Sequence, residues 1–575
     1  MSPSQIIVLA TPVFLLMIAA EYAWSRVRGQ SVYRLNDAIS SISLGIVSQL
    51  SALFTKLLTV GIYTAVYHAV APWPDLPFWS TWYGVLLALV FYDFCYYWQH
   101  RAGHEVAVVW ASHVVHHQSQ AYNLSTALRQ TSSGALLGWI FYLPMALAGV
   151  PPLVVGIVAL VDLLYQFWVH TELVGKLGWF DRVFCSPSNH RVHHAVNDRY
   201  LDKNYGGILV LWDRLFASFR EEDEKCVYGT RANLRSWDPL WANAEVYGAL
   251  LRDSWHTRHW ADKLRLWVKP PGWRPADLAQ RWPRPAFDLQ QVQVFDPPVS
   301  PAVAVFAGAQ FLLLLAGVAT VLWFAGTWPG TRTAVLSATL VACYWALGAV
   351  LQGRLSVAAA LLVESAALAT ATGALDMTDL HQVFKPLTML LAIGLVWRQA
   401  AQTSRARPRA LALLTGALLA SLAGDVFLML RGPQWFIPGL ASFLVAHGFY
   451  IALFRIGQPW FPSRRALLAT LAFGAAMYAH VWNGLGDPVL KVAVAAYVTV
   501  IALMAAQAIG RASVLRTPGA IAVALGACIF MVSDSLIAIN RFVAPLPLAG
   551  LWVLATYYAA QLLIVLHVVP STDRR

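Results

Sequence analysis

Charged side chains are scarce in this sequence. Asp, Glu, Lys and Arg make up only 12% of its 575 residues, whereas hydrophobic residues make up 58%. A water-soluble protein of this length needs far more polar surface, so the composition excludes a soluble globular chain. The bilayer must act as solvent for much of the sequence, and the length favours two domains.

Cysteine is also sparse, and no stretch has the composition of a nucleic-acid-binding surface. The cysteines are Cys95, Cys185, Cys226, Cys343 and Cys528. They share no paired spacing, so neither a disulfide framework nor a thiolate metal site is indicated. The net charge of +12 arises mostly from arginines between apolar runs, as membrane topology requires. We therefore expect no nucleic-acid partner.

Positive charge is missing ahead of the first apolar run. Residues 5–24 are apolar, no basic residue precedes them, and Arg26, Arg28 and Arg34 follow. A cleaved signal peptide carries its positive charge before the apolar run. The pattern therefore favours a retained first span with its N-terminus outside.

Apolar runs that can cross or nearly cross a bilayer recur along the chain. In the first half they lie at about residues 5–24, 38–70, 80–98 and 132–168, the last divided by Pro151-Pro152 into an expected hairpin. In the second half they lie at about residues 302–326, 332–350, 355–374, 384–398, 409–430, 436–455, 466–483, 488–508, 517–539 and 547–569. Residues 172–300, between the two sets, are polar and hold most of the Asp, Glu and Lys.

These runs predict an all-α, multi-pass integral membrane protein. We place a helical domain with a cytoplasmic cap at residues 1–290, a linker and connecting transmembrane helix at 291–330, and a bundle of about eight transmembrane helices at 331–575. If residues 26–34 are cytoplasmic, the positive-inside rule places residues 99–131 and 169–301 on that side too. In a bacterial cell the expected location is the inner membrane.

Histidines gather in the first half. Nine of the sixteen lie between positions 100 and 194. They are His100 and His104, then His113, His116 and His117, then His170, and finally His190, His193 and His194. Positions i, i+3 and i+4 share one helix face, so each group can direct its rings at a common point.

This spacing predicts a metal site on the cytoplasmic side of the first domain. Imidazole nitrogen suits iron, zinc, copper or nickel, and nine ligands can hold two ions. Ligating rings usually need hydrogen-bonding partners that fix their tautomer. The nearby candidates for that role are Asp93, Glu105, Glu172, Asn189 and Asp198. A single histidine pair is more often a surface feature, but three groups together favour metal binding.

The histidine groups resemble the boxes of the fatty acid hydroxylase/sterol desaturase superfamily over about residues 35–245. The segments YWQHRAGHE (97–105), YNLSTALRQ (122–130), QFWVHTE (166–172), DKNYGG (202–207) and WDRLF (212–216) look most like the alkylglycerol monooxygenase subfamily. One departure is Gln118-Ser119-Gln120, where such enzymes commonly carry small polar and acidic residues.

The resemblance implies a di-iron enzyme that inserts one oxygen of O₂ into a lipid C–H bond. The nine histidines would hold two iron ions, although ligand type alone leaves zinc open. For an ether lipid the carbon attacked lies next to the ether oxygen, and the resulting hemiacetal collapses to a fatty aldehyde and a glycerol product. The subfamily implies tetrahydrobiopterin as the electron donor.

Polar residues in the apolar runs of the second half form another candidate site. An ionisable group inside a span suggests function, and interhelical pairing with Lys385 or Arg541 is the alternative. Asp425 and Asp534 stand out because paired carboxylates in a dry site can divide into a proton donor and a charged partner. Such a pair can protonate a vinyl ether carbon and deliver water.

This half resembles the YhhN/lysoplasmalogenase family, an eight-span helical bundle. The matching residues are Lys385-Pro386-Leu387-Thr388, Gly424-Asp425, Gly439, Phe443, His447, Tyr450, Ser533-Asp534-Ser535, Asn540-Arg541-Phe542, Tyr557-Tyr558 and Gln561. The resemblance implies hydrolysis of the vinyl ether of a lysoplasmalogen. Its candidate catalytic residues are Asp425, Asp534, His447, Lys385, Asn540 and Tyr558.

Both resemblances imply release of a fatty aldehyde from an ether-linked lipid. We therefore predict a fused ether-lipid enzyme whose partners are a membrane lipid (alkylglycerol or lysoplasmalogen), O₂ and an electron donor. One alternative is a sterol or fatty-acyl hydroxylase or desaturase with a redox-protein donor, whose second half only binds lipid. A transporter or metal sensor is a further alternative, although the first half lacks the paired broken helices expected of a transporter.

Overall fold

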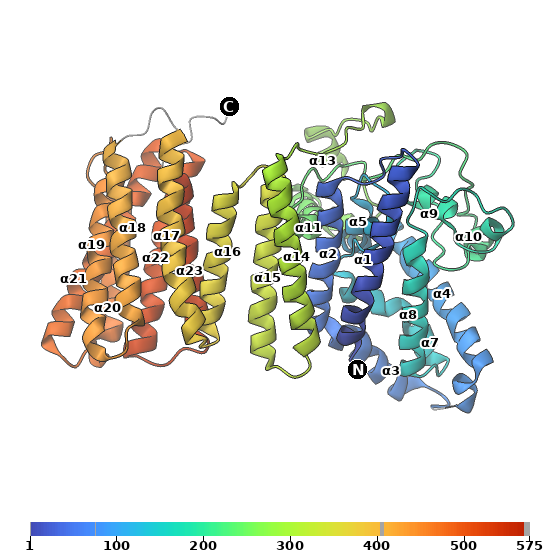
Figure 1. Ribbon diagram of the computed structural model, residues 1–575, viewed down its shortest axis with the longest axis horizontal. Helices are drawn as coiled ribbons and strands as arrows, with labels where there is room; N and C mark the ends of the chain where they lie inside the picture. The colour runs from blue at the N-terminus through green and yellow to red at the C-terminus, as the bar shows by residue number, and fades with distance from the viewer. Residues whose placement is uncertain (1, 75, 403–407, 569–575) are drawn as a thin grey trace. The chain divides into compact units, whose positions relative to one another are not determined.

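The computed structural model describes residues 2–74, 76–402 and 408–568. Helices make up nearly all of the regular structure in these ranges, and the described β-pairing is confined to two isolated bridges (Figure 1). The chain divides into two compact units: unit 1 is Met1–Pro329 with Leu347–Arg354, and unit 2 is Gly330–Ala346 with Leu355–Arg575. The boundary falls after α14 (Pro301–Phe324), which packs beside α1 (Pro3–Val27) in unit 1.

Eleven of the described helices are long and apolar enough to cross a membrane, in agreement with the predicted all-α membrane protein. Several begin with the same local signal, a capping side chain followed by proline. Ser300, Asp487 and Thr517 accept a hydrogen bond from a backbone N–H of the first turn, and the next residue is proline in each case. Proline suits this position because its missing N–H would have had no partner in the helix.

Of the described helices long and apolar enough to cross a membrane, unit 1 contains three complete ones, α1, α14 and α2 (Leu35–Lys56), together with several short helices near the polar segment. The α-helices not yet bounded are α3 (Ile62–Val70), α4 (Trp82–Glu105), α5 (Ala107–His117), α6 (Leu124–Ala127), α7 (Leu143–Leu147), α8 (Pro152–Trp168), α9 (Pro187–His194), α10 (Leu211–Leu215), α11 (Pro239–His256), α12 (Trp260–Val268), α13 (Ala276–Arg281) and α15 (Gly330–Leu351), the last shared with unit 2.

Two predicted runs of unit 1 differ from simple spans. The run at 38–70 is interrupted by a π-helical turn at Leu57–Gly61, between α2 and α3. The run at 132–168 breaks at Pro151, as predicted, but only its second part forms a long helix. Its first part folds into short helical turns, where Gly138 approaches Gln99 so closely that a β-carbon would lie 2.9 Å from Nε2.

Unit 2 is a helical bundle whose eight complete helices match the predicted number. They are α16 (Val357–Ala374), α17 (Thr378–Gln402), α18 (Pro408–Met429), α19 (Phe436–Phe454), α20 (Arg464–Val481), α21 (Pro488–Leu515), α22 (Pro518–Phe542) and α23 (Ala549–His567). Small residues allow close packing: a β-carbon on Gly424 would lie 2.6 Å from the Phe443 ring, so α18 and α19 touch there. This contact places Asp425 inside the bundle.

Candidate metal centre and buried acids

Three helices of unit 1, and the loop after a fourth, carry the nine histidines. They are His100 and His104 at the end of α4, His113, His116 and His117 in α5, His170 after α8, and His190, His193 and His194 in α9. Only Val106, in an extended conformation, separates α4 from α5. A β-carbon on Gly103 would lie 3.3 Å from the His113 ring, so glycine lets the two helices approach closely.

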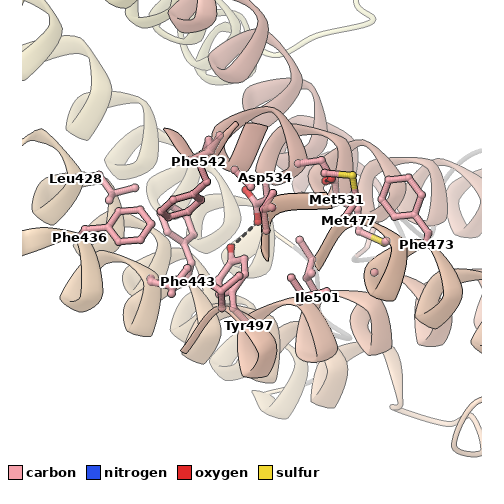
Figure 2. Close-up of a pocket in the computed structure, with 18 residues that line it drawn as sticks. Leu428, Phe436, Phe443, Phe473, Met477, Tyr497, Ile501, Met531, Asp534 and Phe542 are labelled. Carbon is pink, nitrogen blue, oxygen red and sulfur yellow. Dashed lines mark hydrogen bonds between the residues drawn. The ribbon is translucent and has the colours of Figure 1, made fainter. Parts of the chain in front are cut away.

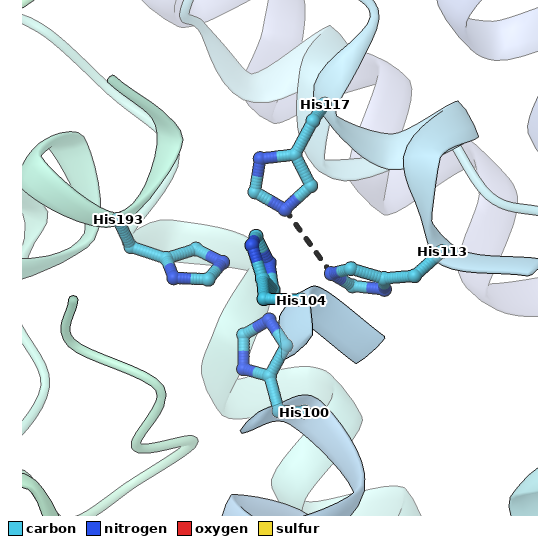
Figure 3. Close-up of side chains that lie close together, drawn as sticks. All are labelled: His100, His104, His113, His117 and His193. Carbon is cyan, nitrogen blue, oxygen red and sulfur yellow. Dashed lines mark hydrogen bonds between the residues drawn. The ribbon is translucent and has the colours of Figure 1, made fainter. Parts of the chain in front are cut away.

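The structure brings these histidines together in two adjacent groups. The first group is His100, His104, His113, His117 and His193 (Figure 3), and the second is His116, His170, His190 and His194. Within each group the possible ligand atoms lie within 4.8 Å of one another. The groups adjoin because consecutive residues on α5 divide between them and the His117 ring stacks on that of His194, with centroids 4.2 Å apart.

Backbone carbonyl groups fix four of the rings. The Nδ1 atoms of His100, His116, His170 and His193 lie 2.8, 2.9, 2.8 and 3.1 Å from the carbonyl oxygens of Tyr205, Arg129, Gln166 and Lys203, respectively. A neutral imidazole that donates through Nδ1 keeps a free lone pair on Nε2. The carbonyls therefore leave Nε2 ready to bind a metal ion.

The Nε2 atoms converge as a metal donor set requires. Within the described ranges, the buried Nε2 atoms of His100, His104, His193 and His194 have no hydrogen-bond partner. Other pairs approach nitrogen to nitrogen, with 3.1 Å between the Nε2 atoms of His116 and His170. Buried polar atoms without partners are costly, and a shared cation satisfies several at once. Each of the two groups could hold a metal ion.

Burial also keeps these rings neutral. It lowers the pKa of His116 to about 4 and lowers the pKa of His117, His193 and His194 well below the usual histidine value. For the last three, neighbouring imidazoles lower the pKa further. Because the neutral form binds metal, few protons need to leave when an ion enters at neutral pH.

The side chains that were expected to orient the histidine rings form hydrogen bonds with other groups. Asp93 accepts hydrogen bonds from the backbone N–H of Ile208 and Leu209 and from the indole of Trp212, at 2.7–3.1 Å. No described hydrogen bond joins a site histidine to the other four, Glu105, Glu172, Asn189 and Asp198. Sequence pattern missed the carbonyl partners because it carries no signal for the direction of a backbone C=O.

A further residue that the histidine pattern missed is Asp213, in the segment WDRLF. Its carboxylate is fully buried and accepts hydrogen bonds from the backbone N–H of Tyr205 at 2.7 Å and of Gly206 at 2.8 Å. The carbonyl of Tyr205 in turn holds His100. Asp213 therefore positions the loop that orients this ring.

The departure at Gln118-Ser119-Gln120 has a structural explanation. Arg129 is buried, donates to the carbonyl of Val115 at 2.7 Å, and has Gln118 Oε1 at 3.3 Å. Ser119 donates to Asp37 at 2.6 Å. These side chains tie α5 to α2 and to the YNLSTALRQ segment, and the carbonyl of the same Arg129 holds His116.

A cavity of about 920 Å³ in unit 1 reaches the metal centre. At one end it is lined by His100, His113, His116 and His170, and elsewhere by apolar residues of α1 and α14 such as Leu15 and Leu312. Small-molecule sites usually measure about 300–1,000 Å³. Since both helices are membrane spans, the apolar wall suits an alkyl chain that comes from the bilayer.

One wall of this cavity carries a hydrogen-bonded polar row. Asp162, Gln166 and His170 follow one another at four-residue spacing on the α8 side. The amide of Gln166 donates to Asp162 at 2.6 Å and accepts from the Tyr96 hydroxyl at 2.7 Å. The row places polar groups within an otherwise apolar space, beside the histidines.

In unit 2, Asp425 forms an interhelical ion pair. Its Oδ1 lies 3.3 Å from Lys385 Nζ, and its Oδ2 accepts a hydrogen bond from Tyr557 at 2.7 Å. Gln561 donates weakly to the same tyrosine and accepts from Tyr450 at 2.6 Å. This is the pairing with Lys385 that the sequence left open as an alternative to catalysis.

Asp534 belongs to a separate network. The hydroxyl of Tyr497 donates to Asp534 Oδ2 at 2.5 Å and lies 3.0 Å from Nε2 of the fully buried His447. The aromatic rings of Phe443 and Phe530 lie between this network and Tyr557, each within 6 Å of the Tyr557 ring centre. The two acids are therefore not a hydrogen-bonded pair within the described bundle.

A cavity of about 80 Å³ opens beside Asp534 (Figure 2). Tyr497 and Asp534 supply polar atoms to a lining that is otherwise mostly apolar, including Phe436, Phe443 and Met531. Within the described residues, Asp534 is the one predicted catalytic residue on this lining. Sequence reasoning missed Tyr497; the signal available was a tyrosine in an apolar run, whose hydroxyl needs a partner when buried.

The last two predicted catalytic residues lie elsewhere. Asn540 accepts a hydrogen bond from the backbone N–H of Leu546 at 2.8 Å, which fixes the turn after α22. Tyr558 is buried against the ring of Tyr557, with centroids 5.0 Å apart. Neither side chain lines the cavity beside Asp534 in the described structure.

Comparison with known proteins identifies both halves. The fatty acid hydroxylase family model matches residues 85–218, and the YhhN family model matches residues 380–568. Human alkylglycerol monooxygenase is 37% identical over 53% of this chain and 69% of its own length. Human lysoplasmalogenases TMEM86A and TMEM86B are each 33% identical, over 29% and 28% of this chain and 69% and 67% of their own lengths.

No solved structure matches the chain. The sequence similarity alone shows the families, because each match covers at least two thirds of a relative at more than 30% identity. Their matched regions also contain the two histidine groups, Asp425 and Asp534. This chain belongs to the alkylglycerol monooxygenase group of the fatty acid hydroxylase family through its first half and to the lysoplasmalogenase group of the YhhN family through its second.

Proposed function

We propose that the protein is a bifunctional membrane enzyme that cleaves ether-linked lipids and releases a fatty aldehyde by two routes. Residues 1–290 carry an oxygenase, residues 331–575 carry a vinyl-ether hydrolase, and residues 291–330 join them. The convergence of nine histidines in two groups is the observation that supports the oxygenase most directly. The family membership of the second half supports the hydrolase.

In the oxygenase, the nine histidines would hold two iron ions, five in one group and four in the other. Iron bound there would supply the activation of O₂ for hydroxylation of the carbon next to the ether oxygen. The cavity walls from α1 and α14 would hold the alkyl chain in line with the histidines and keep water away. The polar row at Gln166 and Asp162 would hydrogen-bond the glycerol end of the substrate.

Tetrahydrobiopterin is the proposed electron donor, and the cytoplasm is the proposed side of the metal centre. Both follow from the subfamily and from the distribution of basic loops. A soluble donor must reach the centre from an aqueous side, and the histidines lie at the last turn of α4 and just beyond the end of α8. Donor dependence is measurable as aldehyde formed with and without the pterin.

The hydrolase half needs neither O₂ nor a metal ion in this proposal. Its substrate would be a lysoplasmalogen, and its chemistry would use the buried polar residues of unit 2. Of the predicted residues, Asp534 lines a cavity, whereas Asp425 is held by Lys385 and Tyr557. The apolar helices around them would take up the alkenyl chain of the lipid.

Product analysis on the purified full-length protein tests the proposal. An alkylglycerol should yield aldehyde only with O₂ and reduced pterin, and a lysoplasmalogen should yield aldehyde under nitrogen as well. His116→Ala should abolish the first product and spare the second, whereas Asp534→Asn should do the reverse. Hydroxylation of a sterol or a fatty acyl chain with a redox-protein donor, in place of ether cleavage, would support the rival function.

A further inference from the structure

A continuous hydrogen-bond chain links a histidine in the interior of unit 2 to the cavity beside Asp534. Tyr497 donates its single hydroxyl hydrogen to Asp534 Oδ2 at 2.5 Å. The 3.0 Å contact to His447 Nε2 must then be a hydrogen bond donated by the imidazole, because a hydroxyl has only one hydrogen. The order of donation is therefore from His447 to Tyr497 to Asp534. His447 Nε2 also lies 3.6 Å from Asp534 Oδ2, which is beyond hydrogen-bonding distance.

The two ends of this chain have different surroundings. His447 is fully buried, and its Nδ1 has no hydrogen-bond partner in the described bundle. Asp534 is about 15% exposed and lines the cavity together with Tyr497. Figure 2 shows the dashed contact between these two side chains among the aromatic and methionine residues of the wall. The chain thus runs from a closed interior to an open space.

Asp425 has a contrasting environment. Lys385 compensates its charge and Tyr557 occupies its second oxygen. The rings of Phe443 and Phe530 stand between it and His447, whose ring centre is 4.8 Å from that of Phe530. A carboxylate held in this way stabilises the contact between α17 and α18, and Asp425 does not line the cavity beside Asp534.

We propose that vinyl-ether hydrolysis takes place in the cavity beside Asp534, with Asp534 as the proton donor and Tyr497 as its positioning residue. This inference rests on the proposed hydrolase function. Because Tyr497 occupies Oδ2, the transferable proton of Asp534 is confined to Oδ1. His447 holds the tyrosine in that orientation. The cavity of about 80 Å³ admits the reacting atoms and a few water-sized groups, and the rest of the alkenyl chain stays outside it.

The reaction balances without an oxidant. The Asp534 carboxyl group gives its proton to the vinyl carbon remote from the ether oxygen, a C–H bond forms, and the carbon next to the oxygen becomes an oxocarbenium centre. Water adds to that centre and returns one proton to the carboxylate. The hemiacetal then breaks its bond to the glycerol oxygen, which takes the remaining hydroxyl proton, and the aldehyde leaves.

Tyr497→Phe is the decisive variant because it removes one hydroxyl and keeps the ring. Tyr497 donates to the carboxylate that forms as Asp534 gives up its proton, and loss of such a hydrogen bond corresponds to about tenfold to hundredfold in rate. We expect kcat for lysoplasmalogen to fall by that factor, KM to change little, and the pH profile of kcat to move. His447→Gln, which keeps a donor to the tyrosine, should retain more activity than His447→Leu.

Tyr557→Phe is the matched control, since it removes a buried hydroxyl that donates to the other carboxylate at a similar distance. It should lower the melting temperature and leave the pH profile of kcat in place. Equal kinetic losses in the two tyrosine variants, or an unchanged pH profile in Tyr497→Phe, would overturn the inference. If the wild-type protein leaves lysoplasmalogen intact, the proposed hydrolase function is wrong. This outcome differs from one in which the wild-type protein is active but the two tyrosine variants behave alike, which contradicts only the role of Tyr497.

Discussion

The histidines of unit 1 and the acids of unit 2 differ in whether their polar atoms have hydrogen-bond partners within the protein. Nε2 of His100 or His194 finds no partner in the described protein, whereas Asp425 and Asp534 already accept hydrogen bonds from tyrosines. A centre built for a cation leaves lone pairs converging on one point. In unit 2, hydrogen bonds from tyrosines hold each carboxylate within a buried polar network.

The largest expected effect comes from removing one ligand of the second histidine group. His116→Ala should reduce oxygen-dependent aldehyde formation by more than the roughly 10–100-fold typical of a changed hydrogen-bonding partner of a ligand. It should also lower the bound iron per chain, measured by elemental analysis. His256→Ala, in an exposed position of α11, is the control and should keep both. An unchanged iron content in His116→Ala would contradict the assignment of His116 as a metal ligand of the second group.

The ion pair of unit 2 should affect stability more than chemistry. Lys385→Met leaves Asp425 buried without a compensating charge, which costs about 3–5 kcal/mol. The melting temperature of the detergent-solubilised protein should fall, with the loss confined to unit 2. The double variant Lys385→Met with Asp425→Leu removes both charges and should recover most of the stability. A double variant no more stable than Lys385→Met would show that the pair is needed for another reason.

A smaller effect is expected at Asp213, which acts on the metal centre through the Tyr205 carbonyl. Asp213→Asn replaces one acceptor oxygen of the loop with an amide and should weaken metal binding by about 10–100-fold. Competition with a chelator measures this affinity. Asp198→Asn, at an exposed acid paired with Arg231, should leave affinity unchanged. Equal losses in both variants would assign the effect to surface charge.

The sequence predicted the helical membrane architecture, the nine converging histidines and the pair of families. These features are periodic or depend on residue type: apolar runs mark spans, and His-x-x-His-His spacing marks one helix face. The π-helical turn at Leu57–Gly61 and the short helices before Pro151 were not predicted, because composition there is as apolar as in a true span. Hydropathy therefore does not distinguish a continuous transmembrane helix from an apolar segment that is broken into shorter helices.

The detailed partners escaped prediction for a different reason. Asp93 was expected to orient a histidine but holds the backbone of Ile208 and Leu209, and carbonyls such as that of Arg129 orient the rings instead. Likewise, the sequence did not predict the tyrosines that donate to Asp425 and Asp534, which are Tyr557 and Tyr497. Such contacts depend on which helices pack together, which residue spacing within one helix does not encode.

The smallest expected effect sharpens the contrast between the two tyrosines that face the cavities. Tyr96→Phe removes a hydroxyl that donates to Gln166 at 2.7 Å on the wall of the oxygenase cavity. A neutral hydrogen bond is worth about 0.5–1.5 kcal/mol, so KM for an alkylglycerol should rise by about twofold to tenfold while kcat changes little. Tyr497→Phe should change kcat instead, because its hydroxyl holds the group that transfers a proton. A fall in kcat without a rise in KM for Tyr96→Phe would mean that the polar row takes part in the chemistry. The wall of the oxygenase cavity would then contribute to the reaction itself, as the Asp534 carboxylate does, and not only to lipid binding.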